Sequence, residues 1–165
     1  MKIAAFDTSS KALTLAILED ETLLAQMTLN IKKNHSITLM PAIDFLMNSL
    51  DMKPTDLDRI AVAQGPGSYT GLRIAVATAK TLAHTLKIEL VGVSSLQALV
   101  PEQAEGLVIP VMDARRNNVY AGFYQSGQAV RPEAHLPLAE VLEMAGAANQ
   151  SVTFVGETTA FTEQI

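Results

Sequence analysis

The residues with the clearest potential for chemistry lie in one glycine-rich segment, GPGSYTGLR, which runs from Gly65 to Arg73. Glycines permit close backbone turns, and a loop that leads into a helix presents free N–H groups and the helix dipole to an anion such as a phosphate. The segment lacks the Lys-Ser/Thr pair of a Walker loop and the glycine spacing of GxGxxG. The alternative interpretation is a tight strand-to-helix turn that is capped by Ser68 or Thr70.

A carboxylate stands at the end of the first apolar run, where Asp7 is followed by Thr8, Ser9 and Ser10. An aspartate at this place suits a metal and phosphate site, but it also caps its own turn by accepting hydrogen bonds from nearby backbone N–H groups. We expect no tightly bound cofactor here and, if any nucleotide binds, only weak binding. The predicted degenerate phosphate-binding site consists of Asp7, Gly65, Gly67, Ser68, Thr70 and Gly71.

Other catalytic and metal-binding patterns find little support in the sequence. The three histidines, His35, His84 and His135, lie far apart without HxxH, HxxxH or HExxH spacing, and neither a GxSxG motif nor a cysteine occurs. We therefore expect no metal site and no catalytic residues. The segment from Asp113 to Arg116 (DARR) offers polar ligands or, alternatively, a turn held by an Asp–Arg pair.

The charge balance argues against a protein that binds nucleic acid by itself. The formal net charge is −5, and phosphate binding needs many lysines and arginines. With 48% hydrophobic and 18% charged residues, the chain has enough apolar material for a core. One side of the helix predicted at 70–87 carries a basic row that consists of Arg73, Lys80, His84 and Lys87. This row is a solvated face, a contact for an acidic partner or a contact for an RNA backbone.

No segment has the apolar length of a signal peptide or the run of about 20 apolar residues that a membrane helix needs. The absence of cysteine fits a reducing compartment. We therefore expect a cytoplasmic protein without membrane contacts.

Apolar periodicity predicts the elements that position these residues. Three strands joined by short turns come first, which indicates an antiparallel opening to the sheet. Pro41 suits only the first turn of a helix, so the regular part of the first helix is expected to begin nearer Thr38. The predicted order is strands at 2–7, 12–18 and 22–29, a helix at 36–50, a strand at 59–63, a helix at 70–87, a strand at 89–93 and a short helix at 94–99.

The stretch at residues 101–106 marks a boundary, so we expect an N-terminal subdomain at 1–103 and a C-terminal subdomain at 104–165. A second set of elements then begins. It comprises an apolar run at 107–112, strands at 118–124 and 151–155, a helix at 138–145 and a helix that starts near 156–158.

This order suits an α/β protein with the actin-like ATPase (ribonuclease-H-like) fold, a mixed sheet with flanking helices in two subdomains, the second of them truncated. Actin-like ATPases carry a glycine-rich hairpin after the first aspartate. No such glycine follows Asp7, which favours the capping alternative.

The first predicted helix is apolar on two sides. One side is a stripe at helical spacing that consists of Leu39, Ile43, Leu46, Met47 and Leu50. The second side consists of Ile37, Met40 and Phe45. A helix of this kind must lie deep in a core or meet a partner.

Several segments resemble the TsaB family, also called YeaZ. GPGSYTGLRIAVATAKTLA is preceded by RIAVAQ and followed by LVGVSSLQAL, and FDTSS, HSITLMPAIDFLM and VIPVMDARRNNVYAGFY match as well. The family's usual string has Phe where Tyr69 stands. The resemblance covers essentially the whole chain in the right order.

The resemblance implies a non-catalytic subunit of the machinery that makes threonylcarbamoyladenosine in tRNA. Such a subunit pairs through its first two helices with a TsaD-like catalytic subunit, or with itself when alone, and a TsaE-like ATPase joins the complex. A TsaC-like protein supplies the threonylcarbamoyl-adenylate, and tRNA is met only through the complex. The expected partner interface comprises Ile37, Met40, Ile43, Phe45, Met47, Arg73, Ala77, Lys80 and His84.

Two alternatives stay open at this point. One is an enzyme, either a glycoprotease-like peptidase or a weak ATPase, against which the missing metal-ligand spacing and the missing glycine after Asp7 argue. The other is direct tRNA binding through the basic row, which predicts steep salt dependence.

Overall fold

The computed structural model describes residues 1–30 and 34–165. They divide into two compact units, Met1–Val93 and Ser94–Ile165. This division falls before the boundary predicted between Gln103 and Ala104. Ser94, the first residue of the second unit, donates a hydrogen bond from its hydroxyl to Glu133 Oε1 in the same unit.

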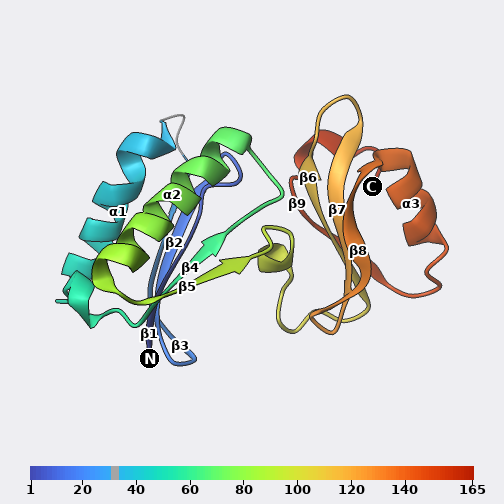
Figure 1. The fold of residues 1–165 in the computed structure, drawn as a ribbon. Helices are drawn as coiled ribbons and strands as arrows, with labels where there is room; N and C mark the ends of the chain where they lie inside the picture. The colour runs from blue at the N-terminus through green and yellow to red at the C-terminus, as the bar shows by residue number, and fades with distance from the viewer. Residues whose placement is uncertain (31–33) are drawn as a thin grey trace. The chain divides into compact units, whose positions relative to one another are not determined.

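The first unit is a mixed five-stranded sheet in the order β3-β2-β1-β4-β5. The first three strands are antiparallel, as the sequence predicted, and β1, β4 and β5 run parallel, which makes the sheet mixed as expected. Both long helices lie on the same face of this sheet (Figure 1). The elements are β1 (Lys2–Asp7), β2 (Leu13–Glu19), β3 (Thr22–Leu29), α1 (His35–Ser49), the 3-10 turn η1 (Pro54–Asp56), β4 (Arg59–Ala63), α2 (Tyr69–Leu86) and β5 (Glu89–Val93).

Alternating side chains of the strands build the core beneath the helices. Phe6 on β1 stands level with Leu15 on β2 and Val62 on β4, and all three are buried. On α2, Ala75 and Ala79 are fully buried, and such small side chains let the helix approach the sheet closely. Packing of α1 and α2 on one face of the sheet fixes where β1 ends and where α2 begins.

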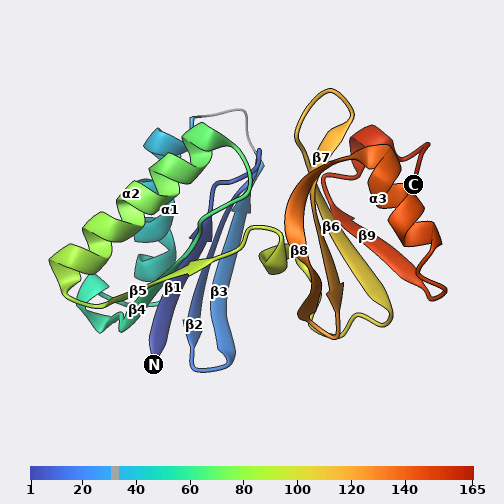
Figure 2. The same cartoon turned by 45° about the vertical axis from the view of Figure 1, so that its right-hand side comes forward.

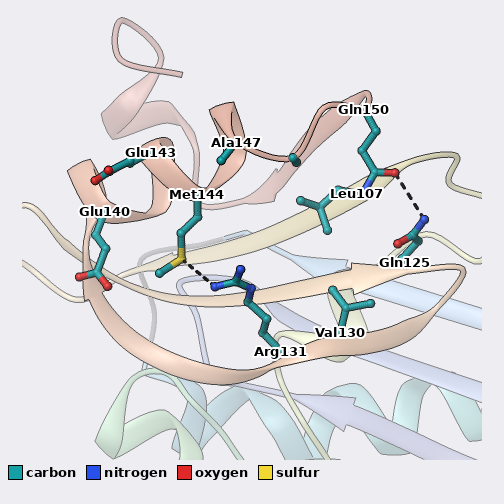
Figure 3. A pocket seen from close by; sticks show the side chains of 10 residues that line it. Leu107, Gln125, Val130, Arg131, Glu140, Glu143, Met144, Ala147 and Gln150 are labelled. Atoms are coloured by element: carbon teal, nitrogen blue, oxygen red, sulfur yellow. Dashed lines mark hydrogen bonds between the residues drawn. The ribbon is translucent and has the colours of Figure 1, made fainter.

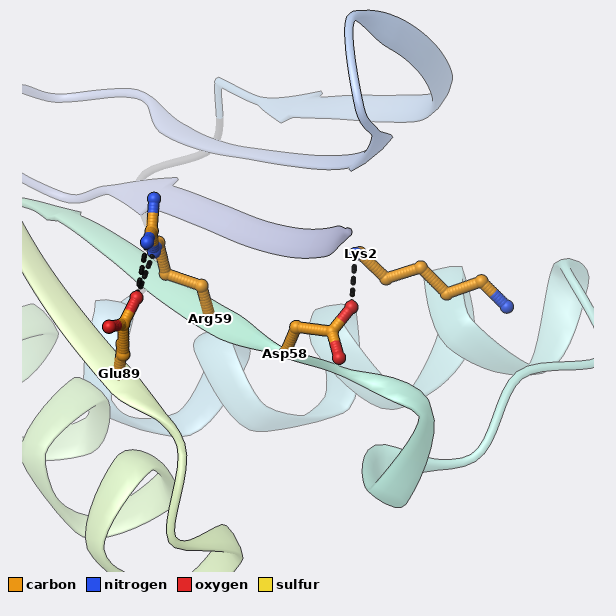
Figure 4. A network of polar contacts seen from close by, with 4 residues as sticks. All are labelled: Lys2, Asp58, Arg59 and Glu89. Atoms are coloured by element: carbon orange, nitrogen blue, oxygen red, sulfur yellow. Dashed lines mark hydrogen bonds and ion pairs between the residues drawn. The ribbon is translucent and has the colours of Figure 1, made fainter.

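Polar contacts hold the start of β4 to both of its neighbours (Figure 4). The backbone N–H of Lys2 donates to Asp58 Oδ2 at 2.6 Å. Arg59 donates from Nε to Glu89 Oε2 at 2.8 Å, and its Nη2 also contacts this oxygen. Ion pairs this exposed add little stability, but these contacts fix the register of β1, β4 and β5.

The helix ends differ slightly from the predictions. Asn34 caps α1 by accepting a hydrogen bond from the Ser36 N–H at 3.0 Å, so the helix begins at His35. The prediction that the regular helix begins near Thr38 is therefore wrong, and Pro41 lies inside the helix on its exposed side. The second helix ends at Leu86, because Lys87 adopts a left-handed conformation (φ 56°).

The second unit repeats the opening of the first, with a four-stranded sheet in the order β8-β7-β6-β9. Its helix α3 lies against one side of that sheet and contributes Leu138 and Val141 to its core (Figure 2). The helix expected after residue 156 is only a 3-10 turn, and β8 was not predicted. The elements are η2 (Gln97–Leu99), β6 (Leu107–Asp113), β7 (Asn118–Gln125), β8 (Gln128–Pro137), α3 (Leu138–Gly146), β9 (Val152–Gly156) and η3 (Thr159–Phe161).

Within residues 1–30 and 34–165, no helix combines the length and the hydropathy that a membrane crossing requires.

Candidate functional site

The glycine-rich loop lies directly on the turn that follows β1. The hydroxyl of Thr8 donates a buried hydrogen bond to the Gly71 carbonyl at 2.7 Å, and the Ser68 N–H donates to the Ser9 carbonyl at 2.6 Å. A Cβ on Gly67 would lie 2.5 Å from the Ser9 carbonyl oxygen, and one on Gly71 would lie 1.9 Å from the Thr8 carbonyl oxygen. The glycines are therefore required by close contact between two segments of backbone.

The predicted phosphate-site residues are brought together, but their groups largely satisfy one another. The carboxylate of Asp7 accepts a hydrogen bond from the Ser9 N–H at 2.6 Å, as the capping alternative requires. Ser68 caps α2 and accepts from the Gly71 N–H at 3.3 Å. Gly65 adopts a φ of 114°, which suits the sharp turn before the helix, and Thr70 is exposed in the first turn of the helix.

One polar group at this place stays without a partner. In the described part of the chain, the Ser9 hydroxyl is buried and forms no hydrogen bond. Thr8 and Ser9 were not in the predicted site, although they supply its contacts to the glycine loop. The Thr-Ser-Ser cluster after the first strand was the available signal.

The outer side of α1 carries large apolar side chains. Ile37 is 66% exposed, Phe45 is 61% exposed and Met40 is 47% exposed. Ile43 and Met47 are instead buried in the core with Leu39 and Leu46, so the prediction that these two residues lie on the partner surface is wrong. Because both sides of α1 are apolar, the sequence spacing did not show which side faces the sheet.

A mostly polar row runs along the exposed side of α2. The predicted residues Arg73, Ala77, Lys80 and His84 are all exposed and follow one another at helical spacing. Tyr69, which the prediction omitted, begins this row and is 74% exposed. Its hydroxyl accepts a hydrogen bond from Arg73 at 3.2 Å, and the guanidinium lies 5.5 Å from the ring centre.

The second unit holds a hydroxyl–carboxylate cluster. Ser94 and Tyr124 both donate hydrogen bonds to Glu133 Oε1, and the Ser94 oxygen accepts from the Leu96 N–H at 3.1 Å. Burial raises the pKa of the Tyr124 hydroxyl well above its usual value, and the hydrogen bond to Glu133 raises it further. The cluster thus anchors the first residue of the unit to β7 and β8.

The raised pKa of Tyr124 predicts a loss of stability at high pH. A folded-state pKa above the unfolded value of about 10 gives stability that is complete below pH 10 and is lost as the pH rises through the folded pKa. Urea unfolding from pH 9 to 11 should show a steeper loss for the natural chain than for Tyr124→Phe. Tyr69→Phe removes an exposed tyrosine as the control, and equal slopes for all three proteins would contradict the assignment.

A shallow pocket of about 490 Å³ lies between α3 and the β7–β8 hairpin (Figure 3). Arg131 points across it to the Met144 sulfur at 3.8 Å, with its guanidinium 5.9 Å from the Phe123 ring centre. The lining holds no pair suited to nucleophilic catalysis. It consists of Leu107, Gln125, Val130, Arg131, Glu140, Glu143, Met144, Ala147, Ala148 and Gln150. No three His, Asp or Glu side chains gather for a metal anywhere in residues 1–30 and 34–165.

Sequence comparison decides the family. The family model described as TsaD, tRNA N6-adenosine threonylcarbamoyltransferase, matches residues 22–165. The tRNA threonylcarbamoyladenosine biosynthesis protein TsaB of Bacillus subtilis is 44% identical over 171 residues, which cover all of this chain and 75% of that protein. The chain belongs to the TsaB family.

A more distant TsaB protein and a solved structure support the same family assignment. The Escherichia coli TsaB is 30% identical over 129 residues, and the match covers 76% of this chain and 55% of that protein. The structure of YeaZ from Pseudomonas aeruginosa is 33% identical with a TM-score of 0.74, over 82% of this chain and 67% of that one. The expected actin-like ATPase fold is thereby confirmed, with two mixed sheets and their helices.

Proposed function

We propose that this chain is a non-catalytic subunit in the formation of threonylcarbamoyladenosine in tRNA, and that it pairs with a TsaD-like subunit through α1 and α2. The exposed side chains of Ile37, Met40 and Phe45 carry this proposal. Large apolar side chains grouped on one exposed helix face are typical of a protein–protein contact. The names of the TsaB relatives give the pathway, the biosynthesis of threonylcarbamoyladenosine in tRNA. The TsaD-like partner is part of our proposal and follows from the resemblance to the TsaB family.

The row on α2 offers the aromatic and charged side chains that accompany the apolar centre of such an interface. Tyr69 and Arg73 are residue types that often dominate binding energy, and their mutual contact orders both side chains in advance. Lys80 and His84 extend the row toward the end of the helix. A partner that presents carboxylates opposite this row would match it in charge.

The contacts of the glycine loop support a subunit without catalysis of its own. In a phosphate-binding loop the backbone amides are free to meet the anion. Here the Ser68 N–H is bound to the Ser9 carbonyl and the Gly71 N–H is bound to the Ser68 hydroxyl. Two of the amides suited to phosphate thus already have partners within the chain.

The remaining partners follow from the same assignment. A TsaE-like ATPase joins the pair, the chain forms a homodimer through the same helices when it is alone, and tRNA is contacted within the complex. One surface on α1 and α2 cannot serve a second copy and a TsaD-like subunit together. Addition of the TsaD-like protein should therefore dissociate the homodimer.

Reconstitution tests the proposal. The TsaD-like protein of the same organism, unmodified tRNA and a threonylcarbamoyl donor are incubated with and without this chain, and the modified nucleoside is measured by mass spectrometry. We expect no product from this chain alone and more product from the pair than from the TsaD-like protein alone. Product formed by this chain alone would contradict a non-catalytic role.

A weak ATPase is the second candidate, which the unpartnered Ser9 hydroxyl beside the start of α2 favours. Purified chain would then release phosphate from ATP, and Asp7→Ala would abolish that release. The scaffold assignment predicts no release above the protein-free control, and equal release from both proteins would indicate a contaminating enzyme.

A further inference from the structure

The turn between β6 and β7 has an unusual backbone. Three successive residues other than glycine, Arg115, Arg116 and Asn117, have φ angles of 66°, 52° and 59°. Side chains disfavour this left-handed region, because Cβ approaches the carbonyl oxygen, and such residues occur singly as a rule. Backbone of this kind persists only where its surroundings hold it, and it is concentrated at functional sites.

Hydrogen bonds hold this turn in place. Asp113 Oδ1 accepts from the Arg115 N–H at 2.8 Å, and Glu157 Oε2 accepts from the Asp113 N–H at 2.9 Å. The Asn118 N–H donates to the Arg115 carbonyl at 3.0 Å, and the Asn118 amide donates to the Arg116 carbonyl at 3.3 Å. The prediction of a turn held by an Asp–Arg pair is thus half right, because the aspartate binds the arginine's backbone and not its guanidinium.

The two guanidiniums that this turn displays have no partner within the described part of the chain. The other three arginines are engaged: Arg59 with Glu89, Arg73 with Tyr69, and Arg131 with Met144 and Phe123. Both Arg115 and Arg116 are exposed, while the nearby carboxylates of Asp113 and Glu157 accept from backbone amides. Two planar, fork-shaped cations on a fixed backbone suit the oxygens of phosphate or carboxylate groups.

An aromatic pair lies just beyond the turn. Tyr120 on β7 stands level with His135 on β8, and their ring centres are 5.3 Å apart at an angle of 64°. Both residues alternate with the core residues Val119 and Ala121, so they lie on the sheet face away from α3. His135 is exposed. Aromatic rings beside paired arginines suit a nucleic acid, because unpaired bases stack on such rings while the phosphates meet the cations.

We propose that the arginine turn, Arg115 to Asn117, is an RNA-contacting surface in which the two guanidiniums bind phosphodiester oxygens and Tyr120 and His135 face an unpaired base. The choice of RNA over an acidic protein rests on the aromatic pair and on the proposed function in tRNA modification. All residues of the site belong to the second unit, and none of them is part of the α1–α2 surface. The site would give the complex an RNA contact that this chain's acidic net charge of −5 alone does not predict.

Salt-dependent binding of a fluorescent, unmodified tRNA transcript tests the proposal, with this chain alone and with its TsaD-like protein added. Each phosphate contact contributes about 0.7 to 0.9 to the slope of log K against log salt, so Arg115→Gln/Arg116→Gln should lower the slope by about 1.5. Lys11→Gln/Lys53→Gln removes the same charge from exposed positions of the first unit and should leave the slope unchanged. Equal slopes for the two double variants, or no binding by the natural chain in either setting, would overturn the proposal.

Two further variants separate the contact from folding and from other partners. Arg116→Gly relieves the left-handed backbone, so it should melt no lower than the natural chain by circular dichroism and yet bind tRNA more weakly. Complex formation with the TsaD-like protein should be unaffected by the arginine double variant, which keeps this test independent of the proposed pairing. If that variant lost the protein partner and kept its salt slope, the turn would be assigned to an acidic protein and the RNA proposal would fail.

Discussion

Replacing Phe45 with aspartate is expected to weaken pairing with the TsaD-like subunit by about 30-fold or more while the chain stays folded. Phe45 is 61% exposed, so a charge there costs the isolated chain little. In an interface centre, loss of a large aromatic residue and burial of a carboxylate cost about 2 to 4 kcal/mol or more, which is a loss of affinity of about 30-fold to 1,000-fold. Isothermal titration calorimetry against the TsaD-like protein measures the loss.

Two control variants sharpen this prediction. Leu23→Asp makes the same kind of change at an apolar residue that is 49% exposed and belongs to β3, not to α1 or α2, and it should leave the affinity unchanged. Ile43→Asp places the charge two residues from Phe45 but in the core, so it should unfold the chain. If Phe45→Asp weakened pairing no more than Leu23→Asp did, α1 would not be the interface.

Gly71→Ala is expected to have the largest effect on stability of any single methyl group added to this chain. The new Cβ would lie 1.9 Å from the Thr8 carbonyl oxygen and 3.0 Å from its carbon, and both belong to backbone that does not rotate away. Separating α2 from the turn after β1 would also break the hydrogen bond of 2.7 Å between Thr8 and the Gly71 carbonyl. We expect a loss of about 3 kcal/mol or more in the free energy of unfolding, measured by urea titration.

Gly146→Ala is the matched control for this substitution. Gly146 ends α3, and a Cβ there meets nothing within 4 Å, so alanine should leave stability unchanged or raise it by up to about 1 kcal/mol. An open phosphate loop would respond to Gly71→Ala through ligand binding and not through folding. Equal unfolding midpoints for the two variants would therefore contradict the close contact between the loop and the turn.

The sequence predicted the strands of the first unit because their apolar runs are short, rich in branched residues and bounded by turn residues. It missed β8, whose sequence QAVRPEAHLP contains Pro132 and is mostly exposed. At the edge of a sheet one side of a strand makes no ladder hydrogen bonds, so proline and polar residues are tolerated there without an alternating pattern.

The candidate site, too, could be predicted from the sequence only in part. The glycines at 67 and 71 could be singled out as positions of close backbone approach, but their contact with Thr8 and Ser9 joins segments about 60 residues apart. Local spacing carries no information about such a contact. The left-handed turn at Arg115 to Asn117 was also out of reach, because residues other than glycine give no local signal for this conformation.

Size-exclusion chromatography with light scattering, on this chain alone and mixed with its organism's TsaD-like protein, tests the central claim most directly. We predict a homodimer alone and a single stoichiometric complex in the mixture, with Phe45→Asp monomeric in both. Two separate peaks at the masses of the unmixed proteins, with the chain folded by circular dichroism, would contradict the assignment of this chain as the partner subunit.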